Sequence, residues 1–334
     1  MRQKLKTKLL IVELWGLGDL MIATPFLRAA AERFDVTLLA KPFALDLRPH
    51  FWPAIEVVPF TAPWTAFRHK YHLWRWPWLE MARLQRRLSG KHFDIGLSAR
   101  WGDPRDHFLL KLSGAKERLG FPRLGSQYFL TQALAQPDPQ SHRYEYWRVM
   151  GQALKVELPP REKAAPAAPR AQATVLIHTG AAQRVRVWPL KSYQQLARRL
   201  RDQSIPVQIA CDADQRAWWL AAGEKDVATP ANASELIALT DRAGTFIGND
   251  SGPGHLAALC GVPTFTIFGP QLPEWFIPLH AAAEGMEGKA CPYKPCKDYC
   301  RYPAPFCLWN VSEEEVWARV KEFVAAHSPL AAAN

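Results

Sequence analysis

One stretch of the chain, Thr245–Phe268, constrains the fold more than any other, because it places a strand, a tight turn, a helix and a second strand in direct succession. It opens with a short apolar run, and Asp250 and Ser251 then supply side-chain oxygens typical of a helix N-cap. The apolar run Leu256–Cys260 continues the helix, and Thr264–Phe268 has the composition of a buried strand. This order predicts a βαβ unit, and hence a parallel sheet in an α/β protein.

The turn of this unit is rich in glycine, which predicts a bound anion. Gly252 and Gly254 allow the backbone to approach a ligand closely. The helix that follows presents unpaired N–H groups and the positive end of its dipole. His255 falls in the first turn of that helix, on the side of the ligand. The stretch therefore predicts a site for a nucleotide diphosphate.

A second glycine-containing turn follows the first strand of the chain. Lys8–Glu13 is typical of a buried strand, Leu14–Asp19 contains two glycines, and a helix is predicted from Leu20. The spacing is not Gly-x-Gly-x-x-Gly, which argues against a dinucleotide site. Asp19 lies at the carboxyl edge of the strand, where open α/β sheets place their ligands. It is therefore either a catalytic carboxylate or the N-cap of the following helix.

Two blocks of strand–helix alternation are predicted on either side of a linker rich in proline and alanine. We expect an N-terminal Rossmann-like domain at residues 1–157, the linker at 158–172 and a C-terminal Rossmann-like domain at 173–334. The last helix, predicted at 312–326, opens with a capping box and is expected to pack back on the first domain.

Five matches, spread over most of the chain, occur in a characteristic order. They are Gly16–Asp19 with Thr24 and Pro25; Phe93–Ser98 with Leu112–Ala115 and Arg118–Phe121; Arg186–Pro189; Asn249–His255; and Phe268–Pro270. Together they resemble glycosyltransferase family 9, the bacterial heptosyltransferases that build the inner core of lipopolysaccharide. The resemblance implies an α/β protein of the GT-B class, with two Rossmann-like domains facing each other across a cleft. The first domain would bind the acceptor and the second the nucleotide sugar.

The resemblance also implies a reaction, the inverting transfer of heptose from ADP-heptose to a lipopolysaccharide inner-core acceptor. Asp19 would then be the catalytic base. The candidate acceptor-binding residues are Gly18, Arg100, Arg118 and Arg123. The candidate donor-binding residues are Arg186, Asp214, Asp250, Ser251, Gly252 and His255. No Asp-x-Asp motif flanks the nucleotide site, so no cofactor is expected to be required for catalysis.

Two of the donor candidates need comment. Asp250 would repel a diphosphate, so it is expected to cap the helix or to accept hydrogen bonds from the hydroxyls of the donor sugar. Arg186 stands where the family usually has lysine, which keeps the charge but changes the geometry of the hydrogen-bond donors.

The charge of the chain indicates anionic partners. Its 334 residues carry a formal net charge of +11, which suits an anionic glycolipid acceptor or an anionic membrane surface.

The segment Trp64–Leu88 mixes tryptophan with lysine and arginine, so it is either a core-facing helix behind a solvated basic loop or a patch that contacts the inner-membrane surface. No pattern of a nucleic-acid-binding module accompanies the charge, and no nucleic-acid partner is expected. With no apolar run of membrane-spanning length and no signal-peptide core, the protein is expected to be cytoplasmic, with peripheral contact at the inner membrane.

Four of the six cysteines cluster near the C-terminus, at Cys291, Cys296, Cys300 and Cys307. Their density suits a structural zinc or iron site, but the spacing lacks the paired C-x2-C of common zinc sites. Reduced thiols on a proline-rich flap, or redox behaviour, remain open as alternatives.

Two other functions also fit the sequence. One is the same fold acting on another nucleotide sugar or on a protein acceptor. The other is a protein without enzymatic activity that binds nucleotides or nucleic acid through its basic surface.

Overall fold

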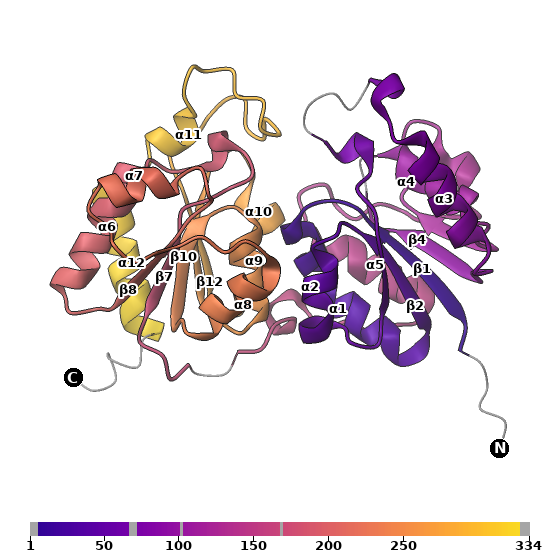
Figure 1. Ribbon diagram of the computed structural model, residues 1–334, viewed down its shortest axis with the longest axis horizontal. Helices are drawn as coiled ribbons and strands as arrows, with labels where there is room; N and C mark the ends of the chain where they lie inside the picture. The colour runs from indigo at the N-terminus through magenta and orange to yellow at the C-terminus, as the bar shows by residue number, and fades with distance from the viewer. Residues whose placement is uncertain (1–5, 67–71, 101–102, 168–169, 328–334) are drawn as a thin grey trace. The chain divides into compact units, whose positions relative to one another are not determined.

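The computed structural model describes residues 6–66, 72–100, 103–167 and 170–327. The chain divides into two compact units, Met1–Leu158 and Pro159–Asn334. Each unit contains a six-stranded sheet in which all paired strands are parallel. Figure 1 shows helices packed around the strands within each unit. The alternation read from the sequence therefore predicts the α/β class correctly.

The first unit has the strand order β3-β2-β1-β4-β5-β6. Its strands are β1 (Lys8–Glu13), β2 (Asp35–Ala40), β3 (Glu56–Pro59), β4 (Ile95–Ser98), β5 (Glu117–Gly120) and β6 (Gln132–Ala133). Its helices are α1 (Leu17–Arg33), α2 (Ala44–Phe51), α3 (Trp78–Ser89), α4 (Pro104–Leu112) and α5 (Tyr144–Leu154), with short 3-10 turns η1 (Pro63–Thr65), η2 (Leu73–Arg75) and η3 (Ser126–Phe129).

The second unit repeats this topology, with the order β12-β11-β10-β7-β8-β9. Its strands are β7 (Val175–His178), β8 (Val207–Ala210), β9 (Val227–Ala228), β10 (Thr245–Asn249), β11 (Thr264–Phe268) and β12 (Ala283–Glu287). Its helices are α6 (Leu190–Asp202), α7 (Arg216–Ala221), α8 (Ala233–Asp241), α9 (Gly252–Leu259), α10 (Pro273–Phe276), α11 (Phe306–Trp309) and α12 (Glu313–His327), with 3-10 turns η4 (Arg161–Lys163) and η5 (Arg184–Arg186).

Both sheets have one point at which the strand order reverses direction. It lies between β1 and β4 in the first unit and between β7 and β10 in the second. At such a point the loops leaving two neighbouring strands run to opposite sides of the sheet, which opens a crevice at the carboxyl ends. The topology therefore marks two candidate sites before any side chain is considered.

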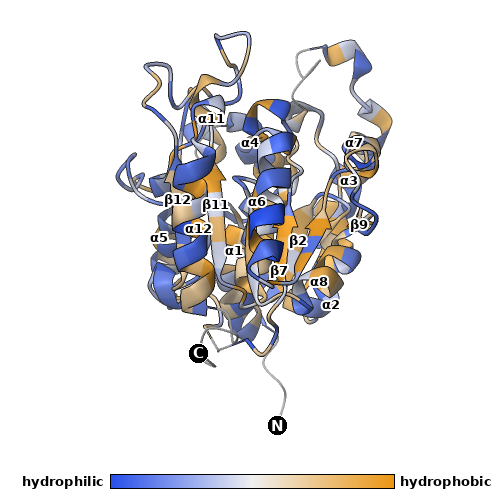
Figure 2. Ribbon diagram, turned by 90° about the vertical axis from the view of Figure 1, so that its left-hand side faces the viewer, coloured by the Kyte–Doolittle hydropathy of each residue, from blue (hydrophilic) through white to orange (hydrophobic). Residues whose placement is uncertain are grey.

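Most strands contribute buried residues to the centre of each unit, and Figure 2 shows β2 largely in the hydrophobic colours while α6 presents mainly hydrophilic residues. In the second unit, α12 buries Val316, Val320 and Phe323 in the same core as Val175 and Phe265. It packs there against α6. Its apolar face is thus buried inside its own unit, and a further contact of this helix with the first domain stays a prediction.

Candidate active site

Asp19 lies at the strand-order reversal of the first unit. It is the third residue of α1, which begins at Leu17 rather than at Leu20 as predicted. One oxygen of its carboxylate accepts a hydrogen bond from the Gly16 backbone N–H at 3.0 Å, and the other pairs with Arg100 Nη1 at 3.1 Å. The Asp19 side chain is 26% exposed. The carboxylate thus caps the helix and is still accessible, so capping and chemistry do not exclude one another.

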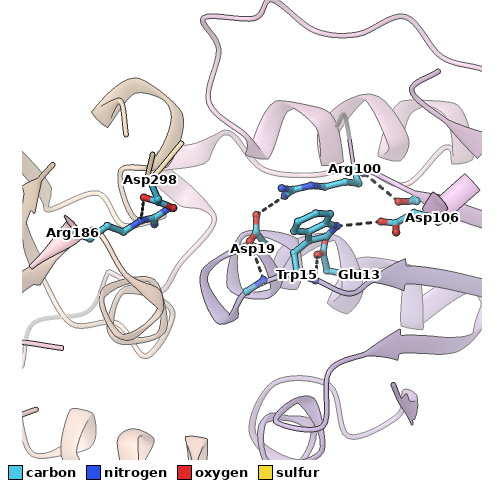
Figure 3. A network of polar contacts seen from close by, with 9 residues as sticks. Glu13, Trp15, Asp19, Arg100, Asp106, Arg186 and Asp298 are labelled. Atoms are coloured by element: carbon cyan, nitrogen blue, oxygen red, sulfur yellow. Dashed lines mark hydrogen bonds and ion pairs between the residues drawn. The ribbon is translucent and has the colours of Figure 1, made fainter. Parts of the chain in front are cut away.

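Arg100 extends from the loop after β4 and is part of a wider network (Figure 3). Its guanidinium lies 3.7 Å from the centre of the Trp15 ring, a cation–π contact. The Trp15 indole N–H donates to Asp106 at 3.2 Å, and the Trp64 indole N–H donates to the other oxygen of the same carboxylate at 3.0 Å. These contacts hold Arg100 against Asp19, and Trp15, Trp64 and Asp106 were not predicted as site residues.

Two buried carboxyl groups accompany Asp19. Burial, and next the charge of Asp19, raise the pKa of Glu13 to about 8. Burial also raises the pKa of Asp106 to about 6. At neutral pH Glu13 therefore holds a proton, and Asp19 remains the nearby carboxylate that water can reach. Glu13 was not predicted as a site residue because it ends an apolar strand. A charged residue at the end of such a strand could have indicated it.

A small pocket opens beside Asp19. It is lined by Glu13, Asp19, Ile22, Ala99, Arg143 and Trp147. Arg143 is almost fully buried, which lowers the pKa of its guanidinium below the ordinary value. A molecule entering this pocket meets a carboxylate and a cation together, an arrangement suited to orienting an anionic compound and taking a proton from it.

The four residues predicted to bind the acceptor do not all lie near Asp19. Gly18 lies in the first turn of α1 with Asp19, and Arg100 contacts Asp19 directly. Arg118 donates to the backbone carbonyls of Ala115 and Phe129 at 2.7 Å each, so it ties the loops around β5 together. Arg123 is exposed. The structure thus brings Gly18 and Arg100 to Asp19, and acceptor contacts of Arg118 and Arg123 stay predictions.

The glycine-rich turn of the second unit lies at its own strand-order reversal, after β10. Ser251 is the N-cap residue of α9, but its side chain makes no cap hydrogen bond, so the predicted capping by Ser251 is wrong. The Asp250 carboxylate instead lies 3.3 Å from Arg186 Nη1. Asp250, Ser251 and His255 are all buried, and Gly252 opens the helix. The Ser251 side chain therefore does not occupy the first N–H groups of α9, and N–H groups at a helix N-terminus are a common site for anions.

Asn249, at the end of β10, fixes the loop that carries Arg186. Its side-chain oxygen accepts from the Trp188 backbone N–H and from the Tyr193 hydroxyl, both at 2.9 Å. Its side-chain amide donates to the Thr179 carbonyl at 2.9 Å. Asn249 is fully buried, so these bonds join β7, β10 and the start of α6 at one place.

Arg186 makes a two-pronged ion pair that the sequence did not predict (Figure 3). Its Nε and Nη2 donate to the two oxygens of Asp298, at 2.7 Å and 2.9 Å. Asp298 follows 112 positions later in the chain, so no local pattern could have indicated the contact. Asp214, predicted to bind the donor ribose, is 62% exposed and lies 3.8 Å from Arg184. Its role in donor binding stays a prediction.

The four clustered cysteines line one pocket, together with Val185, Pro270, Tyr293, Lys294, Arg301, Tyr302, Pro305 and Phe306. All six cysteines of the chain are free thiols. Burial raises the pKa of Cys307 to about 11 and raises that of Cys296, which favours the neutral thiol over the thiolate that binds metals. In the part of the chain that the structure describes, no group of three or more His, Cys, Asp or Glu side chains is arranged to hold a metal ion.

The comparison with protein families decides the identity. The model of glycosyltransferase family 9 (heptosyltransferase) matches residues 81–303, about two thirds of the chain. The chain belongs to glycosyltransferase family 9. The resemblance read from the five sequence matches is confirmed, and the protein is an enzyme of the glycosyltransferase class.

Individual relatives agree with the family. Lipopolysaccharide heptosyltransferase 1 of Pseudomonas aeruginosa is 28% identical, over 97% of this chain and 99% of its own length. Among solved structures, a family 9 glycosyltransferase from Veillonella parvula has a TM-score of 0.77 at 18% identity, over 97% of this chain and 99% of that chain. Escherichia coli heptosyltransferase WaaC with ADP has a TM-score of 0.72 at 18% identity, over 95% of this chain and 100% of that chain. These likenesses confirm the predicted GT-B fold class.

Proposed function

We propose that this glycosyltransferase transfers heptose from ADP-heptose to an inner-core acceptor of lipopolysaccharide, with inversion at the anomeric carbon. The donor nucleotide is suggested by the WaaC structure, which was solved with ADP, and the acceptor class by the name of the Pseudomonas relative. In this proposal the second unit binds the nucleotide sugar and the first unit binds the acceptor.

The observation that carries the proposal is the state of Asp19. Its side chain is partly exposed, accepts a hydrogen bond from the Gly16 N–H and pairs with Arg100 at the carboxyl end of β1, near the buried Glu13, whose pKa is raised by burial. We propose that it takes the proton of the acceptor hydroxyl as that oxygen forms a bond to the anomeric carbon. The bond from that carbon to the diphosphate breaks in the same step, and ADP departs. A single displacement inverts the configuration, and no second carboxylate acting as a nucleophile is needed.

The departing diphosphate needs positive charge. We assign this to the N-terminal N–H groups of α9, with Gly252 and Ser251 at their start, and to the side chains of His255 and Arg186. Asp250 already lies against Arg186, so we assign it to orienting that guanidinium and to the hydroxyls of the donor sugar. In the first unit, Arg100 is assigned to the anionic groups of the acceptor, because it lies on Asp19 and is 18% exposed.

The replacement Asp19→Asn tests the proposed base. Asparagine keeps the size of the side chain and its capping oxygen but loses basicity. Loss of a general base lowers the rate by roughly a hundred- to ten-thousand-fold. We therefore expect kcat to fall by that factor, while ADP affinity and the melting temperature stay near those of the wild type.

The control is Asp46→Asn, which changes an aspartate in the first turn of a different helix of the same unit, α2. It should leave turnover unchanged. Turnover of Asp19→Asn near the wild-type rate, with donor and acceptor both saturating, would mean that Asp19 only caps α1.

We further propose peripheral contact with the cytoplasmic face of the inner membrane. No helix within the described ranges is long and apolar enough to cross a bilayer. Around η2 and the start of α3, the side chains of Leu73, Trp74, Trp78 and Leu79 are all more than half exposed. Arg75, Arg83 and Arg86 are exposed in the same segment. Indole rings beside arginines suit the interface of an anionic bilayer.

This patch is smaller than the predicted segment Trp64–Leu88. Trp64 is buried and Trp76 is half-buried, so both belong to the interior, and residues 67–71 lie outside the described residues. Sedimentation with vesicles rich in phosphatidylglycerol tests the contact. The double replacement Trp74→Ala with Leu79→Ala should reduce binding, whereas Trp309→Ala, an exposed tryptophan of the second unit, should not. Equal binding by both variants would rule out the patch.

The structural zinc or iron ion suggested by the cysteine cluster stays a prediction. Its support is that Cys291, Cys296, Cys300 and Cys307 line one pocket. Elemental analysis of protein purified without chelator should then find zinc or iron near one atom per chain. Metal-free protein of normal stability would leave the four residues as reduced thiols.

A further inference from the structure

The segment between β12 and α11 contacts Arg186, a residue of the proposed donor site, through Asp298. Asp298 lies between Cys296 and Cys300 in the sequence, and its carboxylate accepts both prongs of the Arg186 fork. The Asp298 side chain is only 12% exposed, and Arg186 is 25% exposed. The contact is therefore a partly desolvated, two-bond ion pair, the strong form of an arginine–carboxylate interaction.

The backbone shows how Asp298 is directed to this contact. Lys297 and Asp298 both adopt left-handed conformations, with φ of 51° and 70°. Most residues avoid this region, but aspartate and asparagine tolerate it better than others. These two conformations turn the backbone, and the side chain of Asp298 points away from its own segment towards Arg186.

The charges around Arg186 do not suit a bound diphosphate in this arrangement. One guanidinium faces two carboxylates, Asp298 through Nε and Nη2 and Asp250 through Nη1. A diphosphate is strongly negative, and like charges at hydrogen-bonding distance repel. The Nε–Nη2 edge, which matches a phosphate as well as it matches a carboxylate, is held by Asp298.

We propose that Asp298 is an internal substitute for the diphosphate of the donor, and that donor binding displaces it from Arg186. This inference rests on the proposed donor site. The carboxylate keeps the fork in its binding orientation when the site holds no donor. The diphosphate then takes over the same two N–H groups, and Asp298 turns outward with its segment. Asp298 thus weakens the binding of donor and of ADP alike and favours release of the product.

Asp298→Asn tests this by the direction of its effect. The amide is neutral and competes less well for Arg186, and asparagine tolerates the left-handed backbone as aspartate does. Calorimetry with ADP should show affinity that rises by roughly tenfold, since a hydrogen bond to a charged group is worth somewhat more than that factor. A residue needed only to hold the loop in shape would lower affinity instead.

Three variants complete the experiment. Glu287→Gln removes an acid that pairs with Lys294 near the same segment and should leave ADP affinity unchanged. Asp298→Gly also accepts a positive φ and should raise ADP affinity as Asn does, which covers a folding failure of the first variant. In an Arg186→Gln background, Asp298→Asn should give no further gain, because its effect passes through Arg186.

Unchanged or weaker ADP binding by Asp298→Asn and Asp298→Gly overturns the inference. Arg186→Gln alone decides the separate question of the donor site, because it should weaken ADP binding if Arg186 contacts the diphosphate. Weaker binding by Arg186→Gln together with unchanged binding by Asp298→Asn would therefore keep the proposed function and reject the substitute role.

Discussion

The two units share one strand order, yet the sites at their strand-order reversals have opposite chemistry. In the first unit the site is built around carboxyl groups, Glu13, Asp19 and Asp106, with tryptophan indoles as partners. In the second it is built around the N-terminus of α9, with Arg186 and His255 beside it. Topology selects the place of each site, and the few residues after the strands select its chemistry.

This contrast suits a transfer between two substrates. A base is needed where a hydroxyl loses its proton, and positive charge is needed where a diphosphate leaves. One site crowded with carboxyl groups could not stabilise a departing diphosphate, because the charges would repel. Two units of the same fold, each with different residues after its strands, can provide the base and the positive charge separately. Substitutions in the two units should therefore impair different properties of the protein.

The largest effect on stability is expected in the second unit, at Asn249. Asn249→Ala removes three buried hydrogen bonds and leaves the partner groups at Trp188, Tyr193 and Thr179 without their acceptor or donor. We expect the free energy of unfolding to fall by about 2–4 kcal/mol, since each orphaned buried group costs about 1–3 kcal/mol and the structure relaxes in part. Urea unfolding measures it.

Asn310→Ala is the matched control, because the Asn310 side chain makes a single bond, to the Phe306 carbonyl, and is only half-buried. It should cost less than about 1 kcal/mol. Similar losses for the two variants would show that the network around Asn249 does not support the second site.

The sequence predicted the fold and both glycine-containing turns, for reasons that are local. Strand–turn–helix patterns are read within a few neighbouring residues, so the glycine turns near Asp19 and Asp250 were found directly. The ion pairs that Asp19 and Arg186 make with distant residues were not predicted. Arg100 lies 81 positions from Asp19, and Asp298 lies 112 positions from Arg186. Their pairing depends on how the strands are ordered in the sheet, which periodicity does not encode.

Burial explains the other differences. Trp78, the first residue of α3, is 53% exposed, whereas Leu84 and Leu88 of the same helix are buried in the core. Glu13 was read as part of an apolar strand, and only the three-dimensional surroundings show that its pKa is raised. A pattern gives the face of a helix, but the depth of each residue on that face depends on its neighbours.

A smaller effect is expected for donor binding at His255. His255→Ala removes a buried side chain from the first turn of α9. If it donates a charge-assisted bond to the diphosphate, ADP affinity should fall by about 1.5–3 kcal/mol. Calorimetry measures the loss, and kcat with saturating donor should change less than it does in Asp19→Asn. His50→Ala, on the exposed surface of α2, is the control. Unchanged ADP affinity in folded His255→Ala protein would remove this residue from the site.

The smallest expected effect is the change in the free energy of unfolding with pH that Glu13 causes. It tests the environment of the carboxyl groups in the first unit. Burial holds the pKa of Glu13 at about 8, against about 4.3 for an unfolded glutamate. Between these values the folded protein binds more protons at this group than the unfolded chain does. Stability from this group is complete below about pH 4.3 and is lost as the pH rises towards 8, by at most about 1.4 kcal/mol per pH unit.

Glu13→Gln cannot ionise, so its stability should fall less than that of the wild type between pH 5 and pH 8. Urea unfolding midpoints at each pH give the two slopes. Glu80→Gln, in the first turn of α3 and exposed, should keep the slope of the wild type. Parallel slopes for the wild type and Glu13→Gln would mean that Glu13 is already ionised at neutral pH. Glu13 would then add a buried negative charge next to Asp19, and a raised pKa of Glu13 would no longer distinguish the first site from the second.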